Sequence, residues 1–540
     1  MKHRPSVAVC SGWLALLCLM PLAAGAGREK ASWRTEFIDL TVELDPAGGF
    51  LKGDALIRLR RQTATAGDIL LELNHELSVA SIDDGSGRPL PFDREGRRIA
   101  VHWRAPGPHG ASRSIRMRFQ GSFHERVPEL DYRNAWIGVP VSHAFGTSLW
   151  YPQAPAPARR CRGRISYLVP ENWVVASVGR RTATEALPGA KRIVFAVDSP
   201  ARFSFAAGPF DHEQRSIDGL EMGIFLLGGG PKKTAFYLEN CARILAFFKD
   251  YYGFFPCESF SLVELPADLL GKTGGGSFDG LTFYPPSVLP GDFFLVPVFA
   301  HEIGHCWWGS CVRGVEGPAI NEGLAQMSME LYVEHTLGEK AFRRLLKDGA
   351  LELGVAHSAR SYFWELQSPR SEADSPLSLL LRGKDLPLGV PAEGESNTLH
   401  MLANSKGVFV YAMLRDLIGP EAFRGGLRRA LRRTAGGTIT LDNLRACFER
   451  QGRRRLKWFF AQWFLRAGAP EFSLSFATKA RGRNWRVTGR VTQAGKPYRV
   501  RVEIAFAADG KRQVRAMDVS GEESRFAFIL PFRPQAAELD

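Results

Sequence analysis

The feature that most constrains this chain is a His-Glu-x-x-His sequence in an apolar run that begins after Pro297 and ends at Gly309. No proline separates the two histidines, so we expect one helix to begin near Pro297 and to end near Gly309. Residues four apart lie on one face of a helix, and His301 and His305 can therefore present two imidazoles to one ion. Glu302 projects about 100 degrees away from His301. Its carboxylate would then lie beside the ion, where it can take a proton from a bound water.

A third ligand is available on a second amphipathic helix, which follows a short turn and carries Glu322 near its start. If this helix returns antiparallel to the first, Glu322 reaches the histidine pair. Two histidines and one glutamate leave a fourth position for water, which is the open arrangement of a catalytic zinc. Glu316, in the turn, and Glu330, about two turns further along the helix, are rival third ligands. We predict one Zn²⁺ ion held by His301, His305 and Glu322.

These two helices resemble the M1 family of zinc metallopeptidases, which includes aminopeptidase N and leukotriene A4 hydrolase. The resemblance rests on His-Glu-x-x-His followed by Asn321-Glu322-Gly323. In that family eighteen residues separate the second histidine from the glutamate, and here there are sixteen, 306–321. We place the shortening in the loop, where it would leave Glu322 unrotated on its helix. The resemblance implies a thermolysin-like, mainly helical zinc catalytic domain.

The first 26 residues predict a secretory signal peptide. They combine a positive start, an apolar core and the small-residue cleavage site Ala24-Gly25-Ala26. The alternative is an uncleaved anchor, because residues 7–26 approach the length of a membrane span. No other stretch is long and apolar enough to cross a bilayer. We expect an exported protein, periplasmic or secreted, with no integral membrane span after cleavage.

Composition limits the classes of partner. The 540 residues carry a formal net charge of +14, which is compatible with nucleic acid or an anionic membrane surface. An exported chain without a recognition motif does not favour nucleic acid. Six cysteines remain after signal cleavage and form no Cys-x-x-Cys pair, so a thiolate zinc site is unsupported. We expect a peptide as the partner of this chain.

Hydrophobic periodicity divides the chain into regions of different fold class. Residues 27–212 contain short alternating runs that predict an N-terminal antiparallel β domain. From about residue 235 the period becomes helical, and 213–467 are expected to form the catalytic domain. Residues 468–540 alternate again and predict a small β-sandwich. The fold class is therefore multidomain α+β, and the regions 27–212 and 468–540 resemble the β domains that flank the M1 catalytic domain.

A glycine-rich strand precedes the zinc motif and is the predicted substrate-binding element, formed by Gly274, Gly275, Gly276, Ser277 and Asp279. Its bare backbone can pair with the main chain of a peptide. It resembles the family's Gly-x-Met-Glu-Asn strand, in which the glutamate binds the free α-amine of the substrate. That position is Ser277 here, and a hydroxyl lacks the charge that selects a cationic N-terminus. Asp279 is two residues on and, in a strand, would point to the same side; it is an alternative acid.

A helix is expected over residues 397–417 and contains Asn404-Ser405-Lys406-Gly407. The family has Tyr-x-Lys-Gly here, and its tyrosine hydrogen-bonds the oxyanion. In this chain the position is Asn404, whose amide can donate a hydrogen bond but is shorter. His400, one turn earlier, is an alternative donor. A lone histidine is more often a packing residue, which is the interpretation that we favour for His400.

Two functions are consistent with these features. The first is an exported M1-like zinc peptidase that hydrolyses peptide bonds, with Glu302 as general base, Asn404 as a catalytic residue and an altered recognition of the N-terminus. The second is a zinc-binding pseudoenzyme or peptide-binding protein with little activity, suggested by Ser277 and Asn404. The retention of Glu302 beside two intact ligands favours the peptidase, because a metal scaffold alone has no need of a base.

Overall fold

The structure is a computed structural model of the chain. It describes residues 33–62, 68–103, 110–127, 132–155, 159–271, 275–291, 296–348, 386–390, 399–400 and 402–539. The predicted signal peptide, residues 1–26, and Gly274 of the predicted substrate strand lie outside these ranges. The chain divides into two compact units: the first contains residues up to 457 except 384–387, and the second contains residues 458–540 and that short segment.

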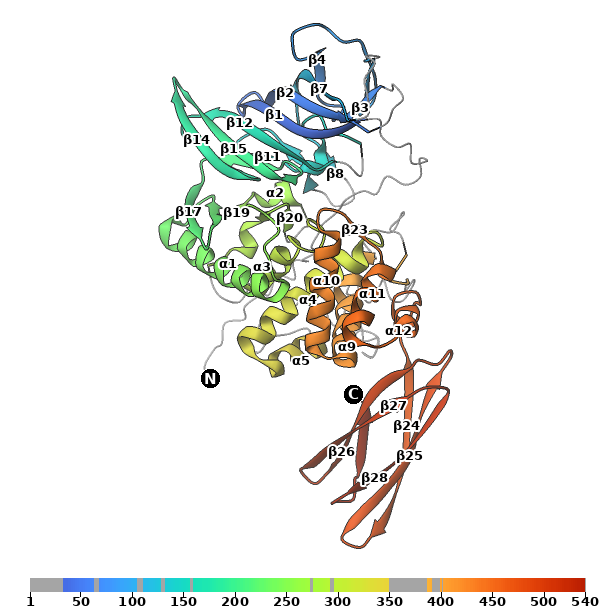
Figure 1. The fold of residues 1–540 in the computed structure, drawn as a ribbon. Coiled ribbons are helices and arrows are strands. Elements are labelled where there is room, and N and C mark those ends of the chain that lie inside the picture. Colours follow the sequence, from blue (N-terminus) through green and yellow to red (C-terminus); the bar gives the residue numbers. More distant parts are fainter. Residues whose placement is uncertain are drawn as a thin grey trace. The chain divides into compact units, whose positions relative to one another are not determined.

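The first unit begins with a seven-stranded sheet whose long strands are prominent in Figure 1. In β1 (Trp33–Asp45) the side chains of Ile38, Leu40 and Val42 are buried, while those between them are more exposed. This alternation places one face of the sheet on the core and confirms the predicted β region. The strand order is β14 (Arg180–Leu187), β15 (Ala190–Ala201), β12 (Cys161–Pro170), β1, β2 (Phe50–Arg61), β7 (Ser112–Ser122), β4 (Ser78–Asp83). β1 and β12 pair in parallel, and the other neighbours pair antiparallel.

Three smaller sheets complete this β region. They are β10 (Ala135–Trp136), β11 (Ser142–Ala144), β16 (Phe205–Gly208) and β13 (Val174–Ser177); β3 (Ile69–Glu72), β6 (Arg98–Val101) and β5 (Phe92–Glu95); and β8 (Arg126–Val127) with β9 (Tyr132–Arg133). Their buried side chains belong to one hydrophobic cluster that continues to Phe278 and Phe283. The β region is therefore packed onto the strands that lie next to the predicted catalytic site.

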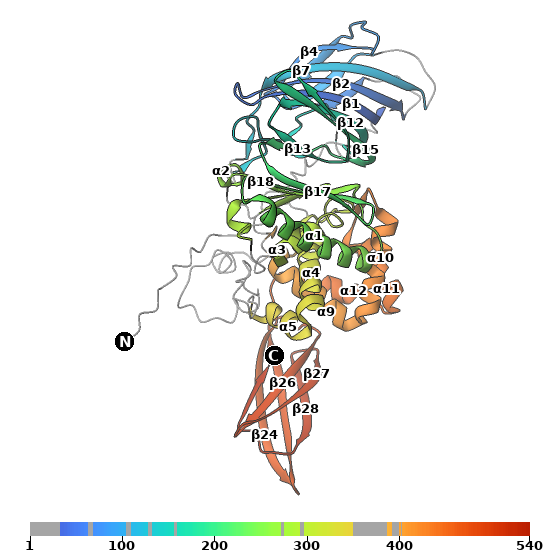
Figure 2. The same ribbon diagram turned by 90° about the vertical axis from the view of Figure 1, so that its left-hand side faces the viewer.

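A five-stranded sheet follows, in the order β17 (Asp211–Ile217), β18 (Leu220–Leu226), β19 (Ser259–Glu264), β21 (Leu281–Tyr284), β20 (Gly276–Phe278). The three central strands are parallel, and β17 and β20 are antiparallel edges. Helix α1 (Gly230–Tyr252) connects β18 to β19 and lies beside β17 and β18 (Figure 2). Because β20 is an edge strand, its outer backbone groups can pair with an added strand.

The remainder of the first unit is mainly helical. Its described elements are α2 (Ala267–Leu270), α3 (Val296–Gly304), α4 (Pro318–Leu337), α5 (Glu339–Asp348), the π-helical turn η5 (Ala403–Gly407), α9 (Val408–Ile418), α10 (Pro420–Thr434), α11 (Leu441–Gly452) and the short pair β22 (Arg313–Gly314) with β23 (Thr438–Ile439). The α-helix expected over 397–417 therefore contains a π-helical turn before α9. Among the described residues, no helix is both long enough and apolar enough to cross a bilayer.

The second unit contains two three-stranded sheets. This agrees with the small β-sandwich that the alternating sequence of residues 468–540 predicts. The sheets are β24 (Glu471–Arg481), β25 (Asn484–Ala494) and β28 (Glu523–Leu530), and β27 (Lys511–Val519), β26 (Val500–Ala508) and β29 (Ala536–Leu539). A separate hydrophobic core includes Val491, Ile504 and Phe526. The unit also takes in residues 458–463 of α12 (Lys457–Trp463), before the predicted edge at 467, since Trp463 packs on Tyr498 with ring centroids 5.1 Å apart.

Candidate metal centre

Helix α3 carries both His301 and Glu302 but ends at Gly304, short of the predicted end at Gly309. The backbone N–H of His305 still bonds to the carbonyl of His301 at 3.3 Å, so the helical spacing of the two histidines is kept. The chain then turns, with Gly309 at a φ of +116°, a conformation that glycine adopts at little cost. The turn directs the carbonyl of Trp308 to Nδ1 of His305, at 2.9 Å.

Helices α3 and α4 pack antiparallel at close range, as expected for a returning second helix. His301 lies beside Gln326, and His305 lies beside Glu322, one turn earlier on α4. Gly304 makes the approach possible, because a Cβ at this position would lie 2.9 Å from Cβ of Ser328. This contact is closer than packed side chains tolerate, so the glycine sets the spacing of the two helices.

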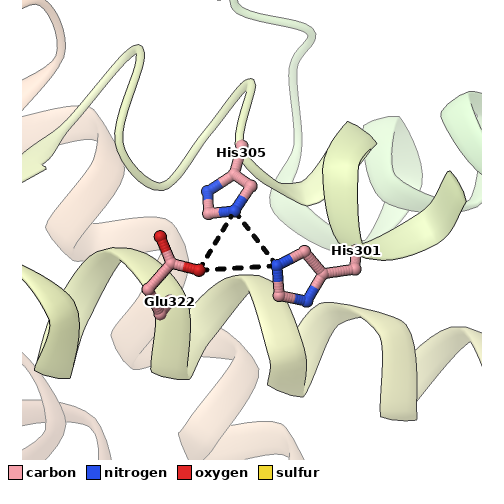
Figure 3. A group of neighbouring side chains, drawn as sticks. All are labelled: His301, His305 and Glu322. Carbon is pink, nitrogen blue, oxygen red and sulfur yellow. Dashed lines mark hydrogen bonds and ion pairs between the residues drawn. The ribbon is translucent and has the colours of Figure 1, made fainter. Parts of the chain in front are cut away.

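His301, His305 and Glu322 converge at one point, as Figure 3 shows. The two Nε2 atoms lie 3.1 Å apart. Oε2 of Glu322 lies 3.6 Å from Nε2 of His301 and 3.5 Å from Nε2 of His305. All three side chains are about 1% exposed. Within the described residues, this is the group of His, Cys, Asp or Glu side chains whose ligand atoms could hold a metal ion.

The hydrogen bonds around the two rings determine what these atoms offer. Nδ1 of His301 faces Oε1 of Gln326 at 2.9 Å, and Nδ1 of His305 faces the carbonyl of Trp308. Both partners are acceptors, so each Nδ1 carries the proton and each Nε2 has a lone pair. Two lone pairs and a carboxylate oxygen then meet in a buried space. This arrangement is repulsive without a cation, and it fits a tetrahedral zinc with one open position.

Glu302 lies beside the cluster without being part of it. Both of its carboxylate oxygens are buried, and neither has a hydrogen-bond partner among the residues that the structure describes. Burial raises the pKa of Glu302 to about 8, against the lowering influence of His305. A cation bound nearby would lower this pKa. A buried carboxyl whose pKa lies near neutrality is suited to exchanging a proton with a water.

The two rival ligands lie elsewhere. A carboxylate oxygen of Glu316 accepts from the backbone N–H of Leu441 at 2.9 Å, at the start of α11. Glu330 is buried and is not part of the cluster, and burial raises its pKa well above the usual range. The sequence analysis did not identify Gln326 or the Trp308 carbonyl. The position of Gln326, four residues after Glu322 and hence on the same helix face, was the available signal.

Asn404 lies in the π-helical turn η5, which packs against α4. Its Nδ2 donates to the carbonyl of His400 at 3.3 Å, while its buried Oδ1 has no hydrogen-bond partner in the described part of the chain. An oxyanion requires a donor, so the unused atom of Asn404 has the wrong polarity. His400 is also buried, and its Nδ1 lies 3.7 Å from Oε1 of Glu322.

The predicted substrate strand is shorter than expected. Gly276 and Ser277 lie in β20, Gly275 directly precedes it, and β20 contacts α3. Ser277 is buried and pairs in register with Thr282 on β21. The strand therefore lies next to the helix that carries His301, at the edge of its sheet.

Asp279 does not follow the strand alternation that would have placed it on the side of Ser277. The strand ends at Phe278, and Asp279 has a φ of +50°. Its carboxylate lies 2.5 Å from Nη2 of Arg160 and accepts from the backbone N–H of Arg202 at 3.1 Å. Both arginines belong to the N-terminal β region, so Asp279 joins that region to the end of β20. The alternative in which Asp279 receives the substrate amine is not favoured by this geometry.

Comparison with known proteins agrees with this arrangement. Residues 236–463 match the peptidase family M1 domain. Aminopeptidase M1-B of Oryza sativa subsp. japonica is 22% identical over 382 residues, which cover 66% of this chain and 41% of that protein. Leukotriene A-4 hydrolase of Xenopus laevis is 27% identical over 214 residues, which cover 39% of this chain and 32% of that protein. The chain thus spans about two fifths or less of the length of these relatives.

Two solved structures share the fold. The M1 zinc metallopeptidase mutant of Deinococcus radiodurans bound to a Tyr-Ser-Ala substrate has a TM-score of 0.66 at 18% identity, covering 82% of this chain and 96% of that one. Aminopeptidase A of Legionella pneumophila in complex with aspartic acid has a TM-score of 0.70 at 15% identity, covering 95% of this chain and 59% of that one. The matched domain, the relatives and the shared multidomain fold agree with the site geometry: residues 236–463 of this chain are a peptidase family M1 domain.

Proposed function

We propose that this chain is an exported zinc-dependent peptidase. The observation that carries the proposal is the convergence of two imidazole lone pairs and one carboxylate oxygen, with both oxygens of Glu302 unpaired beside them. His301, His305 and Glu322 would hold one zinc ion. When bound, zinc supplies a Lewis acid that polarises a scissile carbonyl and lowers the pKa of a water.

The chain's own residues supply the proton transfers and the alignment of the substrate. Glu302 takes the proton of the attacking water and passes it to the leaving amine, since its carboxylate is buried and close to neutrality in pKa. The edge strand β20 pairs with the backbone of the peptide and holds the scissile bond in line with Glu302. We assign the alignment to the backbone of Gly275, Gly276 and Ser277.

An aminopeptidase with altered recognition of the N-terminus is the form of this activity that we propose. Two aminopeptidases of Oryza sativa subsp. japonica are among the relatives that this chain resembles. Ser277 stands where the family places the glutamate that binds the amine, and Asp279 is held by Arg160 and Arg202. Without a carboxylate at the strand, a free amine would contribute little to binding, and peptides with blocked N-termini should be cleaved as well.

The second candidate is a zinc-binding protein that binds peptides with little activity. It is favoured by Asn404, because its unpaired atom is an acceptor and its donor faces His400. The loss of one oxyanion donor typically costs about a hundred- to a thousandfold in rate. Such a protein would keep both the zinc and the peptide-binding strand.

Peptide cleavage separates the two candidates. The purified zinc-loaded protein would be incubated with a pool of free and acetylated peptides, in parallel with Glu302→Gln, which keeps the size of the side chain but removes the base. We expect cleavage of both kinds of peptide, reduced roughly a hundred- to ten-thousandfold in Glu302→Gln. Zinc-loaded protein that cleaves no faster than Glu302→Gln would leave the binding protein as the better account.

Export is tested on the mature protein. Mass spectrometry of the chain recovered from outside the cytoplasm should give an N-terminus at Gly27 if the segment 1–26 is a cleaved signal. A chain that keeps its first 26 residues and stays with the membrane would support the uncleaved anchor instead.

A further inference from the structure

The two carboxylate oxygens of Glu322 have different neighbours. Oε2 faces the two imidazole nitrogens, at 3.5 and 3.6 Å. Oε1 faces Nδ1 of His400 at 3.7 Å, an electrostatic contact slightly longer than a hydrogen bond. A free carboxylate can rotate and offer either oxygen, or both, to a metal. In this structure Oε1 already faces the His400 ring, and Oε2 is left to face the two ligand histidines.

His400 is brought to Glu322 by the segment that contains the π-helical turn. In this segment Gly407 lies against Gly323, the residue that follows Glu322: a Cβ built on Gly407 would lie 3.5 Å from Cα of Gly323, an ordinary van der Waals contact. The segment therefore packs directly on the part of α4 that carries Glu322. π-helical turns inside α-helices are frequent at functional sites because they re-aim the side chains of one turn.

The two ring nitrogens of His400 have different surroundings. The ring is buried, and among the described residues its Nε2 has no hydrogen-bond partner. Because Nδ1 faces a carboxylate, the proton lies on Nδ1.

We propose that His400 is a positioning residue for the metal ligand Glu322: its Nδ1–H occupies Oε1, so that Oε2 alone is presented to the ion. The role rests on the proposed zinc site and differs from the oxyanion role considered from the sequence. When a metal-ligating side chain loses the residue that orients it, the affinity of the site for its metal typically falls about ten- to a hundredfold. One-oxygen binding also preserves the open fourth position that a water needs.

Zinc affinity, measured by competition with a chromogenic chelator, tests this role without reference to activity. His400→Leu removes the N–H, whereas His400→Asn has nearly the same size and retains an N–H near the position of Nδ1. We expect His400→Leu to bind Zn²⁺ about ten- to a hundredfold more weakly and His400→Asn to stay within about threefold of the parent, because the N–H dipole is preserved. Leu399→Ala, at the neighbouring buried position, controls for loosening of the segment and should keep the parental affinity per folded chain.

A spectroscopic readout distinguishes positioning from packing. In the Co²⁺-loaded protein, release of Oε1 in His400→Leu would raise the coordination number, and the visible d–d absorption should weaken, while His400→Asn should keep the parental spectrum. Parental zinc affinity in His400→Leu, or equal weakening in His400→Asn, would overturn the proposal. If His400→Leu fails to fold, His400→Phe serves in its place, because a ring of similar shape without an N–H should weaken zinc binding more than His400→Asn does. Absence of zinc binding by the parent protein would instead remove the proposed function itself.

Discussion

The metal triad and the substrate strand lie next to each other, but their positions have different origins. The triad depends on residues one helical turn apart: His301 on α3 and His305 directly after it, and Glu322 and Gln326 on α4. The end of β20 depends on residues far away in the chain, because Arg160 and Arg202 hold Asp279 and Phe145 stacks on Phe278. A motif therefore defines the metal site, whereas the N-terminal β region shapes the strand.

The largest effect that separates the two regions should come from the triad itself. Glu322→Ala removes one of three ligands, and we expect zinc affinity to fall well beyond the roughly hundredfold loss typical of an outer-shell change. Zinc should also cease to raise the melting temperature, because a ligand stabilises only the state that binds it. Calorimetric titration and thermal melts measure both quantities. Glu330→Gln, on the same helix, is the matched control, and its loss of zinc would instead favour the rival ligand.

A large stability effect is expected at the strand. Asp279→Ala leaves two arginines of the β region without their buried carboxylate, which typically costs about 3–5 kcal/mol. The free energy of unfolding of the first unit, from urea titration, measures this loss. Asp218→Ala is a matched control, because Asp218 also has a φ of +50° but is exposed. Equal losses in the two variants would mean that the left-handed backbone, and not the ion pair, accounts for the effect.

A smaller effect on the metal is expected from the outer partner of His301. Gln326→Leu removes the acceptor of Nδ1, so that the ring can exchange its tautomer or rotate, and we expect zinc affinity to fall about ten- to a hundredfold. Gln326→Glu keeps an acceptor and should retain affinity. The same chelator competition measures both variants, and unchanged affinity in Gln326→Leu would show that Gln326 does not orient His301.

The smallest effect tests the substrate strand. Ser277→Glu returns a carboxylate to the position where the family has one, and we expect the ratio of cleavage of free to acetylated peptides to rise by about tenfold, as for one hydrogen bond between charged groups. Ser277→Gln has a similar size without the charge and should leave the ratio near the parental value. Equal ratios in the two variants would place amine recognition outside β20.

The sequence was sufficient wherever a pattern repeats over neighbouring residues. Alternation predicted β1 and the strands of the second unit, and the spacing of His301 and His305 predicted that the two imidazoles share one side. Each of these patterns depends on the period of a helix or a strand, which is the same in every protein.

The remaining features depend on contacts that no local pattern encodes. The helix ends at Gly304, and the chain then turns and brings the Trp308 carbonyl to His305. Asp279 leaves the strand because Arg160 is about 120 positions away in sequence and reaches it only in the fold. Tertiary contacts thus override the alternation expected of the strand.

The measurement that tests the central claim most directly is the metal content and coordination of the purified protein. Elemental analysis should give one zinc per chain, and X-ray absorption should show nitrogen and oxygen ligands near 2.0–2.1 Å with the signature of two imidazoles. Glu322→Ala should lose this signal. A protein that binds no zinc, or one whose zinc has sulfur ligands from a neighbour such as Cys306, would contradict the assignment of His301, His305 and Glu322.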